Sequence, residues 1–240
     1  MKFISSLLLS TVLGVASMSA AAPAGFKSLF NGKDLSGWEG NPALWSVKEG
    51  VIVGKTTAEA PIKSNTFLIW KGGELKNFEL RASFRFVDNN EKRTANSGIQ
   101  YRSRVVDPAG WVVGGYQGDM DAAGRYVGML YEEKGRGILA KPGEKVKLHP
   151  IENGKPKIEV VGESAPSAKV SAAFKPDGWN EIVIIAKGNH LQHFLNGVQT
   201  ADITDLDPQK SAASGVLALQ IHTGPPMQIQ FKDLALKTLP

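Results

Sequence analysis

The strongest constraint on the fold is an alternation of apolar and polar residues with a period of two. It is clearest in the segment FELRASFRF, whose apolar side chains are those of Phe78, Leu80, Ala82, Phe84 and Phe86. Because successive side chains of a β-strand point to opposite faces of a sheet, this spacing predicts a strand with one buried side. Helical periodicity is hard to find along the chain. An all-β fold is therefore expected.

Further segments have the composition of strands. They are residues 97–102, 181–186, 191–195, 216–221 and 227–236, and a tight turn at Asn196-Gly197 follows the third of them. The apolar run 181–186 is typical of a strand buried on both faces. Short strands and turns in a chain with 26 Gly and 13 Pro indicate an antiparallel β-sandwich, because a parallel sheet would need crossover helices.

The domain organisation follows from the ends and the middle of the chain. Lys2 precedes an apolar run of 13 residues, 4–16, and small residues follow at 20–22. This order predicts a signal peptide over residues 1–22, and hence a periplasmic or secreted protein. The run is too short to span a membrane. With no repeat and no linker in sight, residues 23–240 are expected to form one sandwich domain, in which 132–178 holds hairpins and long loops.

Composition excludes several classes of function. The chain has no cysteine, so disulfides and thiolate sites are impossible. The net charge of +5 comes from basic residues interleaved with acidic ones, a pattern that argues against nucleic-acid binding. No phosphate-binding loop, zincin or serine-hydrolase motif is present. The four histidines have no metal-ligand spacing, so no metal site or cofactor is predicted, although a metal-assisted enolate would be chemically sensible.

The polar faces of the predicted strands supply the candidate site residues. If Leu219 and Ile221 fill the core, then Gln220 and His222 point the other way. The same alternation gives a set of polar candidates on other strands: Glu79, Arg85, Gln100, Arg102, Gln117 and Asp119. A concave sheet could gather these groups into one cleft suited to sugar hydroxyls. The alternative is that they are the solvated faces of ordinary antiparallel strands.

Aromatic residues and one histidine complete the candidates. Trp38, Trp45 and Trp179 lie near turns or strand starts and are interpreted as core anchors. Trp111, in a glycine-flanked loop, is the best candidate for an exposed ring that contacts a sugar. His193 is included with it as a substrate-binding candidate.

Several strings, taken in order, resemble one known family. They are FKSLFNGKDLSGW from Phe26, NSGI from Asn96, GYQ from Gly115, WNE from Trp179, LNG from Leu195 and LQIH from Leu219. The family is that of the 3-keto-disaccharide hydrolases, also described as 3-keto-glucoside-1,2-lyases and 3-keto-2-hydroxy-glucal hydratases. The resemblance extends over nearly the whole mature chain. It implies a concanavalin A-like jelly roll and a carbohydrate substrate.

The chemistry implied by the resemblance assigns expected roles. A ketone at C3 acidifies the hydrogen on C2, a base removes it, the enolate expels the C1 oxygen, and water then adds to the 2-hydroxyglucal. His222 is the best-placed base, because a free imidazole titrates near pH 6.5, at about the working pH. Arg102 or Arg85 could steady the oxyanion, and Asp119 or Glu79 could protonate the leaving oxygen. The glutamines at 100, 117 and 220 would orient hydroxyls.

Two other functions are compatible with the same residues. A non-catalytic, lectin-like glycan-binding module would use the polar face without turnover, because this type of fold serves both purposes. A structural or adhesive exported domain would have no affinity for sugars. We therefore expect a carbohydrate-cleaving enzyme and keep the lectin as the main alternative.

Overall fold

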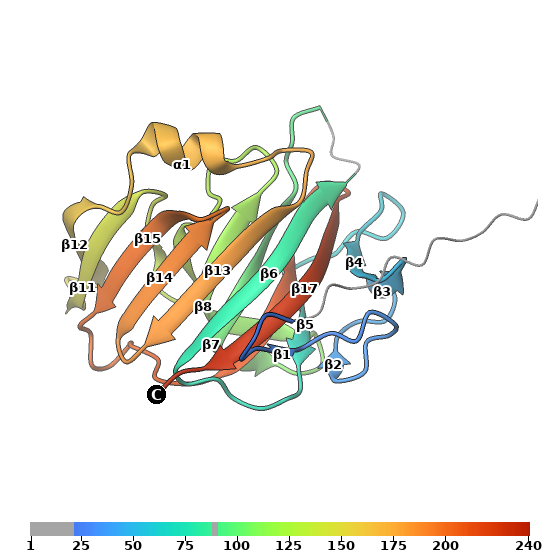
Figure 1. The fold of residues 1–240 in the computed structure, drawn as a ribbon, viewed down its shortest axis with the longest axis horizontal. Helices are drawn as coiled ribbons and strands as arrows, with labels where there is room; N and C mark the ends of the chain where they lie inside the picture. Colours follow the sequence, from blue (N-terminus) through green and yellow to red (C-terminus); the bar gives the residue numbers. More distant parts are fainter. Residues whose placement is uncertain (1–21, 88–90) are drawn as a thin grey trace, which may run out of the picture.

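A computed structural model describes residues 22–87 and 91–240 and shows two β-sheets packed face to face (Figure 1). The larger sheet contains, in spatial order, β12 (Lys155–Glu163), β11 (Glu144–Glu152), β15 (Val198–Asp205), β14 (His190–Leu195), β13 (Asn180–Lys187), β6 (Phe78–Val87), β17 (Gln228–Thr238), β4 (Val51–Lys55) and β3 (Trp45–Lys48), with β1 (Lys27–Ser28) against β17. The smaller sheet contains β10 (Gly137–Ala140), β9 (Leu130–Glu133), β8 (Val112–Asp121), β7 (Asn96–Asp107), β16 (Val216–Ile221), β5 (Thr66–Trp70) and β2 (Trp38–Glu39). The predicted antiparallel all-β sandwich is confirmed.

The apolar faces of both sheets form the core. Along β6, buried and half-buried residues alternate without interruption, as its period of two predicts. The core includes Phe84 and Ile184 from the larger sheet and Tyr101 and Leu219 from the smaller one. Burying such side chains removes apolar surface from water, at about 25 cal/mol per Å². This core fixes which face of each strand is left for other uses.

Two features depart from a plain antiparallel sandwich. The pair β11–β15 is parallel, whereas the neighbouring pairs β11–β12 and β14–β15 are antiparallel. A short helix, α1 (Ser167–Ala173), lies beyond the ends of β14 and β15 and buries Val170 (Figure 1). It falls in the segment where hairpins and loops were expected, and it was not predicted from the sequence.

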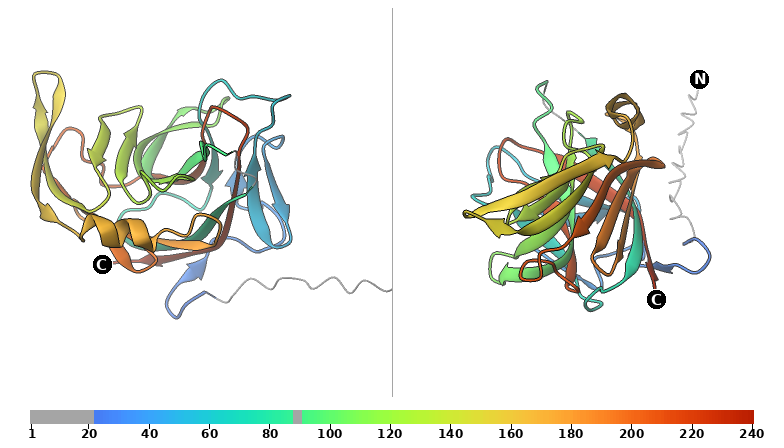
Figure 2. Two further views of the ribbon diagram at one scale, coloured as in Figure 1. Left: turned by 90° about the horizontal axis from the view of Figure 1, so that it is seen from above. Right: turned by 90° about the vertical axis from the view of Figure 1, so that its left-hand side faces the viewer.

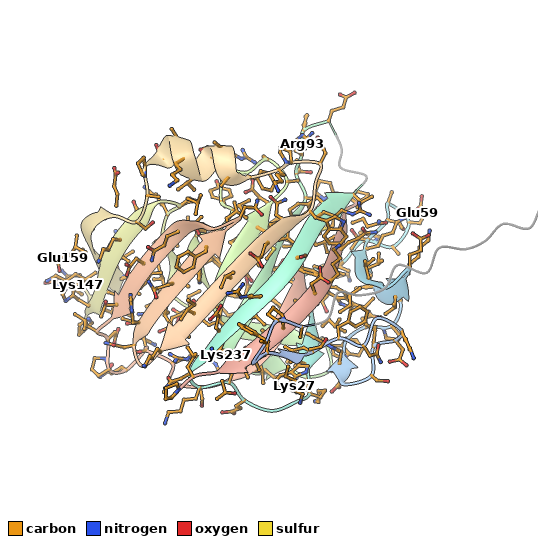
Figure 3. The ribbon with its side chains drawn as sticks, viewed as in Figure 1. Lys27, Glu59, Arg93, Lys147, Glu159 and Lys237 are labelled. Atoms are coloured by element: carbon orange, nitrogen blue, oxygen red, sulfur yellow. The ribbon has the colours of Figure 1, made fainter. Side chains whose placement is uncertain are left out.

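The larger sheet ends in two hairpins. Seen from above, β11–β12 and β3–β4 stand at opposite ends of the molecule, with β7 and β8 between them (Figure 2). Strand β12 is an edge strand, and Lys147 of β11 pairs across to its Glu159, where Figure 3 shows both side chains. Charges at an edge discourage pairing with other chains.

The last two strands occupy the interior of the two sheets. Strand β16 lies between β5 and β7, and β17 lies between β6 and β4. Both sheets are therefore completed by strands that lie within residues 216–240.

The structure leaves the predicted signal peptide untested. The predicted signal peptide, residues 1–22, lies outside the described residues except for Ala22. Over 22–87 and 91–240, no helix is long and apolar enough to cross a membrane.

Candidate functional site

A cavity of about 270 Å³ opens on the outer face of the smaller sheet. Strand β8 turns Tyr116 into the core and Gln117 and Asp119 outward, as predicted. Strand β9 pairs with β8 so that Tyr131 lies opposite Gln117. The lining side chains come from both strands and from neighbouring segments: Asn65, Asn96, Gln117, Asp119, Tyr126, Met129, Tyr131, Glu133, Ile138 and His222.

The carboxyl group of Asp119 is the most strongly perturbed group of this cavity. It is 4% exposed, and it accepts hydrogen bonds of 3.0 Å from the side-chain amides of Asn96 and Gln117. The pKa of Asp119 is raised to about 7 by burial above all and by the charge of nearby Asp121, against the two hydrogen bonds, which lower it. Asp119 can therefore give or take a proton near neutral pH, as a general acid or base must.

Three buried glutamines hold Asp119 in place. The side-chain amides of Gln100 and Gln117 approach to 2.8 Å, and Gln220 Nε2 donates to Gln117 Oε1 at 2.9 Å. Gln117 lies across Gly98 so closely that a Cβ there would come within 2.5 Å of its Cδ. These residues lie on three adjacent strands and are almost completely buried. The glutamines thus orient Asp119, and only Gln117 reaches the cavity itself.

His222, Asn65 and Glu133 form another part of the wall. His222 Nδ1 contacts the main-chain carbonyl of Thr223, and because a carbonyl only accepts, Nδ1 donates and Nε2 of the neutral ring keeps its lone pair. Asn65 Nδ2 donates to Glu133 Oε2 at 3.2 Å, and Asn65 Oδ1 accepts from the amide of Thr223 at 2.9 Å. This network ties His222 and Glu133 to one side of the cavity.

The remaining wall is apolar. Tyr126 and Ile138 are 41% and 44% exposed, which is high for large apolar side chains, and Met129 is buried beside them. Next to this wall, burial and the charges of Glu133 and Asp119 raise the pKa of Tyr131. The cavity therefore has a polar floor that can bond hydroxyl groups and an apolar flank.

The expectation that the polar candidates line one cavity holds for some and fails for others. Gln117, Asp119 and His222 line it, and Gln100 and Gln220 support it from below. Trp111 does not line it. The indole packs on the same outer face with a small apolar cluster formed by Phe67, Ile69, Val113 and Ala218.

Glu79 and Arg85 belong to the other sheet, so their prediction as site residues is wrong. Both lie on β6, on the outer face of the larger sheet, where Glu79 accepts hydrogen bonds from Arg81. The guanidinium of Arg85 lies 4.7 Å from the ring centre of Trp179. Trp179 is therefore on the outer face as well, and its interpretation as a core anchor is wrong, whereas Trp38 and Trp45 are core residues.

Arg102 has a structural position. Its guanidinium donates to the main-chain carbonyls of Lys76, Gly188 and Ala212 at 2.7, 2.6 and 3.2 Å, and the residue is 2% exposed. A break in the β7–β8 register next to it, where Arg102 has φ of 46°, turns the side chain away from the face that alternation predicts. Its donors serve loops, so the prediction that it steadies an oxyanion is wrong.

His193 points into the core. It is fully buried, Tyr101 Oη lies 2.8 Å from its Nε2, and its Nδ1 donates to the carbonyl of Gly128 at 3.2 Å. Burial lowers its pKa to about 4, so the ring is neutral at ordinary pH. The prediction that it binds substrate is wrong, because no substrate reaches it there.

Several cavity residues were not predicted. Tyr131 and Glu133 alternate along β9 as Gln117 and Asp119 do along β8, and this signal was present in the sequence. Asn65 precedes β5, and Asn96 begins β7, inside the string NSGI. Nothing local marks Asn65, because its role depends on β5 pairing with β16.

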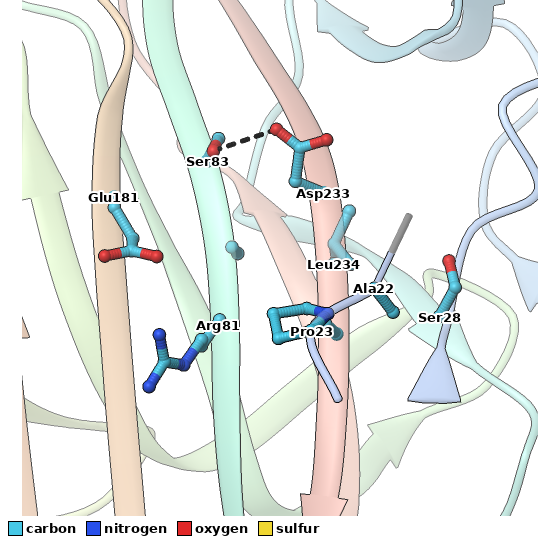
Figure 4. Close-up of a pocket in the computed structure, with 10 residues that line it drawn as sticks. Ala22, Pro23, Ser28, Arg81, Ser83, Glu181, Asp233 and Leu234 are labelled. Atoms are coloured by element: carbon cyan, nitrogen blue, oxygen red, sulfur yellow. Dashed lines mark hydrogen bonds between the residues drawn. The ribbon is translucent and has the colours of Figure 1, made fainter. Parts of the chain in front are cut away.

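A smaller cavity, of about 200 Å³, lies on the outer face of the larger sheet (Figure 4). Its polar groups are largely engaged with one another: Arg81 bonds Glu79, and Ser83 Oγ donates to Asp233 at 3.2 Å. In the described residues, no group of three or more His, Asp or Glu side chains is placed to hold a metal ion. The cavity around Asp119 and His222 is therefore the candidate functional site.

Comparison with solved structures shows the fold. A candidate glycosyl hydrolase from Parabacteroides distasonis superposes with a TM-score of 0.55 at 18% identity, covering 90% of this chain and 94% of its own. The carbohydrate-binding module CBM66 from Bacillus subtilis gives 0.53 at 14%, covering 84% and 96%. A Bacillus subtilis protein with a galectin-like fold gives 0.57 at 10%, covering 92% and 98%. The predicted jelly-roll architecture is confirmed.

Sequence comparison shows the family. No protein of curated function matches the chain. The family model described as the 3-keto-alpha-glucoside-1,2-lyase-like domain matches residues 25–237. The chain therefore belongs to the 3-keto-alpha-glucoside-1,2-lyase-like family, as one of its carbohydrate-active β-sandwich domains.

Proposed function

We propose that the protein is an exported enzyme that cleaves 3-keto-glycosides by elimination across C1 and C2, followed by hydration. The observation that carries the proposal is a buried carboxyl group, Asp119, which has a pKa of about 7 and lines the same cavity as His222. Elimination and hydration need one group that accepts a proton and one that donates a proton, both near the working pH. The export of the enzyme is inferred from residues 1–22 alone.

The roles follow from the positions of the two groups. His222 Nε2, with a lone pair in the neutral ring, removes the proton from C2 of the sugar, which is acidified by the C3 ketone. As the C1–O bond breaks, protonated Asp119 supplies a proton to the leaving oxygen, and the electron pair of that bond leaves with it. Water then adds across C1 and C2 of the 2-hydroxyglucal: ionised Asp119 takes a proton from the water that attacks C1, and His222 returns its proton to C2, which restores both groups. The sum is one water consumed and one glycosidic bond broken.

The walls of the cavity fit the two parts of such a substrate. Asn65 and Asn96 present amides that can both donate and accept, as sugar hydroxyls require, whereas the Gln117 amide is engaged by Gln100, Gln220 and Asp119. Tyr126, Met129 and Ile138 give the apolar flank on which a leaving group can rest. The cavity volume, about 270 Å³, is close to that of small-ligand sites and suits one sugar ring.

The test uses 3-keto-disaccharides and aryl 3-keto-glucosides of both anomeric configurations, with hydrogen or deuterium at C2. We expect release of the leaving group and a slower rate with deuterium, because the C2–H bond breaks. Asp119→Asn and His222→Gln should each reduce kcat by about 10²–10⁴-fold, the usual contribution of a general acid or base. The Glu79→Gln variant, altered on the other sheet, should retain full activity.

Three outcomes would contradict the proposal. One is the absence of turnover with every linkage, with and without added divalent metal. Another is turnover that neither substitution affects. The third is binding of neutral oligosaccharides, measured by calorimetry, without turnover of any 3-keto substrate, and this result would favour the lectin-like alternative.

A further inference from the structure

A third and larger hollow lies on the opposite side of the molecule from the candidate site. It has a volume of about 650 Å³ and lies on the outer face of the larger sheet, where β3, β4, β6 and β17 meet. We call it the basic cleft. Its lining residues are Ser46, Lys48, Glu49, Val51, Val53, Lys55, Arg85, Val87, Trp179, Gln228, Gln230 and Lys232.

The charges of the basic cleft are unbalanced. Four cationic side chains line it, those of Lys48, Lys55, Arg85 and Lys232, against the single carboxylate of Glu49. In the described part of the chain, no carboxylate forms an ion pair with the first three of these cations, and Lys232 approaches only Asp233, at 3.8 Å. Like charges held together destabilise the fold, so a bound anion would relieve the repulsion.

Part of the basic cleft is already ordered. The Trp179 ring is flanked by Arg85, whose guanidinium carbon lies 4.7 Å from the ring centre, and by Lys232, whose Nζ lies 4.5 Å from it. Arg85 Nε also donates to Oε1 of the buried Gln230, at 2.7 Å. These contacts hold two of the four cations in position, so their ordering entropy is not lost on binding.

We propose that the basic cleft binds an acidic oligosaccharide through its carboxylate groups. The cleft is far larger than one inorganic anion needs, since a water molecule has a share of about 30 Å³ in the liquid. Its cations extend from β3 to β6, so they match charges repeated along a chain. The amides of Gln228 and Gln230 and the hydroxyl of Ser46 also line the basic cleft and can bond sugar hydroxyls. This site is independent of the proposed function.

The test measures binding of tri-galacturonate by calorimetry in low and physiological salt, with maltotriose as the neutral probe. We expect tri-galacturonate to bind, salt to weaken the binding, and maltotriose to show no heat at the same site. The double variant Lys55→Glu, Lys232→Glu should bind at least about tenfold more weakly, because each charge reversal replaces an attraction with a repulsion.

The matched control is the double variant Lys147→Glu, Lys155→Glu, which also reverses two charges, at the opposite end of the same sheet, where Figure 3 shows Lys147. It should bind tri-galacturonate as the wild type does. Equal weakening by the control would show an effect of net charge alone and would overturn the proposal. So would the absence of binding, or inorganic phosphate binding as tightly as the oligosaccharide. A cooperative denaturation transition with a midpoint no lower than that of the wild type verifies that the Lys55→Glu, Lys232→Glu variant folds.

Discussion

The stability of the Asp119→Asn variant, relative to that of the wild type, should increase as the pH rises. The carboxyl group has a pKa of about 7 in the folded protein, against 3.8 when unperturbed. This difference corresponds to about 4 kcal/mol of stability. It is present at low pH and is lost as the pH rises past 7. Between the two pKa values the folded protein holds a proton that the unfolded chain has released, so stability falls as the pH rises. An amide has no such proton.

The pH-dependent change in stability can be separated from the other effects of the substitution. Between about pH 5 and pH 8, the wild type should lose roughly 2–3 kcal/mol through this one group, whereas Asp119→Asn should not. The amide also places an NH₂ group opposite one donor, from Asn96 or Gln117, at a constant cost of about 1–3 kcal/mol. Because that cost does not change with pH, the slope of the difference reports the pKa.

Urea denaturation followed by tryptophan fluorescence at several pH values provides the measurement. The free energy of unfolding of the variant, minus that of the wild type, should rise by roughly 2–3 kcal/mol from about pH 5 to pH 8. The exposed Asp177 gives a control, because Asp177→Asn should change stability by less than about 0.5 kcal/mol at any pH. A difference for Asp119→Asn that stays constant with pH would refute the raised pKa, and with it the acid role of Asp119.

Three further predictions follow from buried and exposed neighbours of the site. The pKa of His193 is lowered from 6.5 to about 4, so on acidification from pH 7 to pH 5 the unfolded chain takes up a proton there and the folded protein does not. This one group should lower the free energy of unfolding of the wild type by roughly 2 kcal/mol, and in His193→Gln that loss should be absent in the same urea titrations. Gly98→Ala should displace Gln117 and lower kcat at least about tenfold while the protein stays folded by circular dichroism; unchanged kinetics would contradict the packing. Ile138→Ser should raise KM for aryl 3-keto-glucosides severalfold and leave 3-keto-disaccharides unaffected; equal effects on both would exclude an apolar subsite.

The parts of the fold and site that depend on alternation could be predicted from the sequence. Period two placed Gln117 and Asp119 on one face of β8, and Gln220 on the outward face of β16, because each strand keeps its pleat from end to end. The same argument assigned Glu79 and Arg85 a polar face correctly. It could not say which of the two sheets that face belonged to, since strand pairing joins residues far apart in the chain.

Local irregularities account for the remaining errors. Arg102 leaves its predicted face at a break in the strand register, and nothing in its neighbouring residues marks that break. His193 is a polar side chain on the buried face of β14, and Tyr101 and a main-chain carbonyl satisfy it there. Such exceptions depend on partners from distant strands, so residue type alone favours a wrong answer.

The position of β16 and β17 has a consequence for how the chain acquires its structure. In the described ranges 22–87 and 91–240, strands β5 and β7 are joined only through β16, and β4 and β6 only through β17, yet these last strands are synthesised more than a hundred residues later. During synthesis, the earlier strands lack their central partners, so neither sheet can close before β16 and β17 have left the ribosome. Such distant pairing makes folding slow, on the order of milliseconds to seconds. Removal of even the last strand should leave a chain that is digested rapidly by proteases, however much of its core sequence remains.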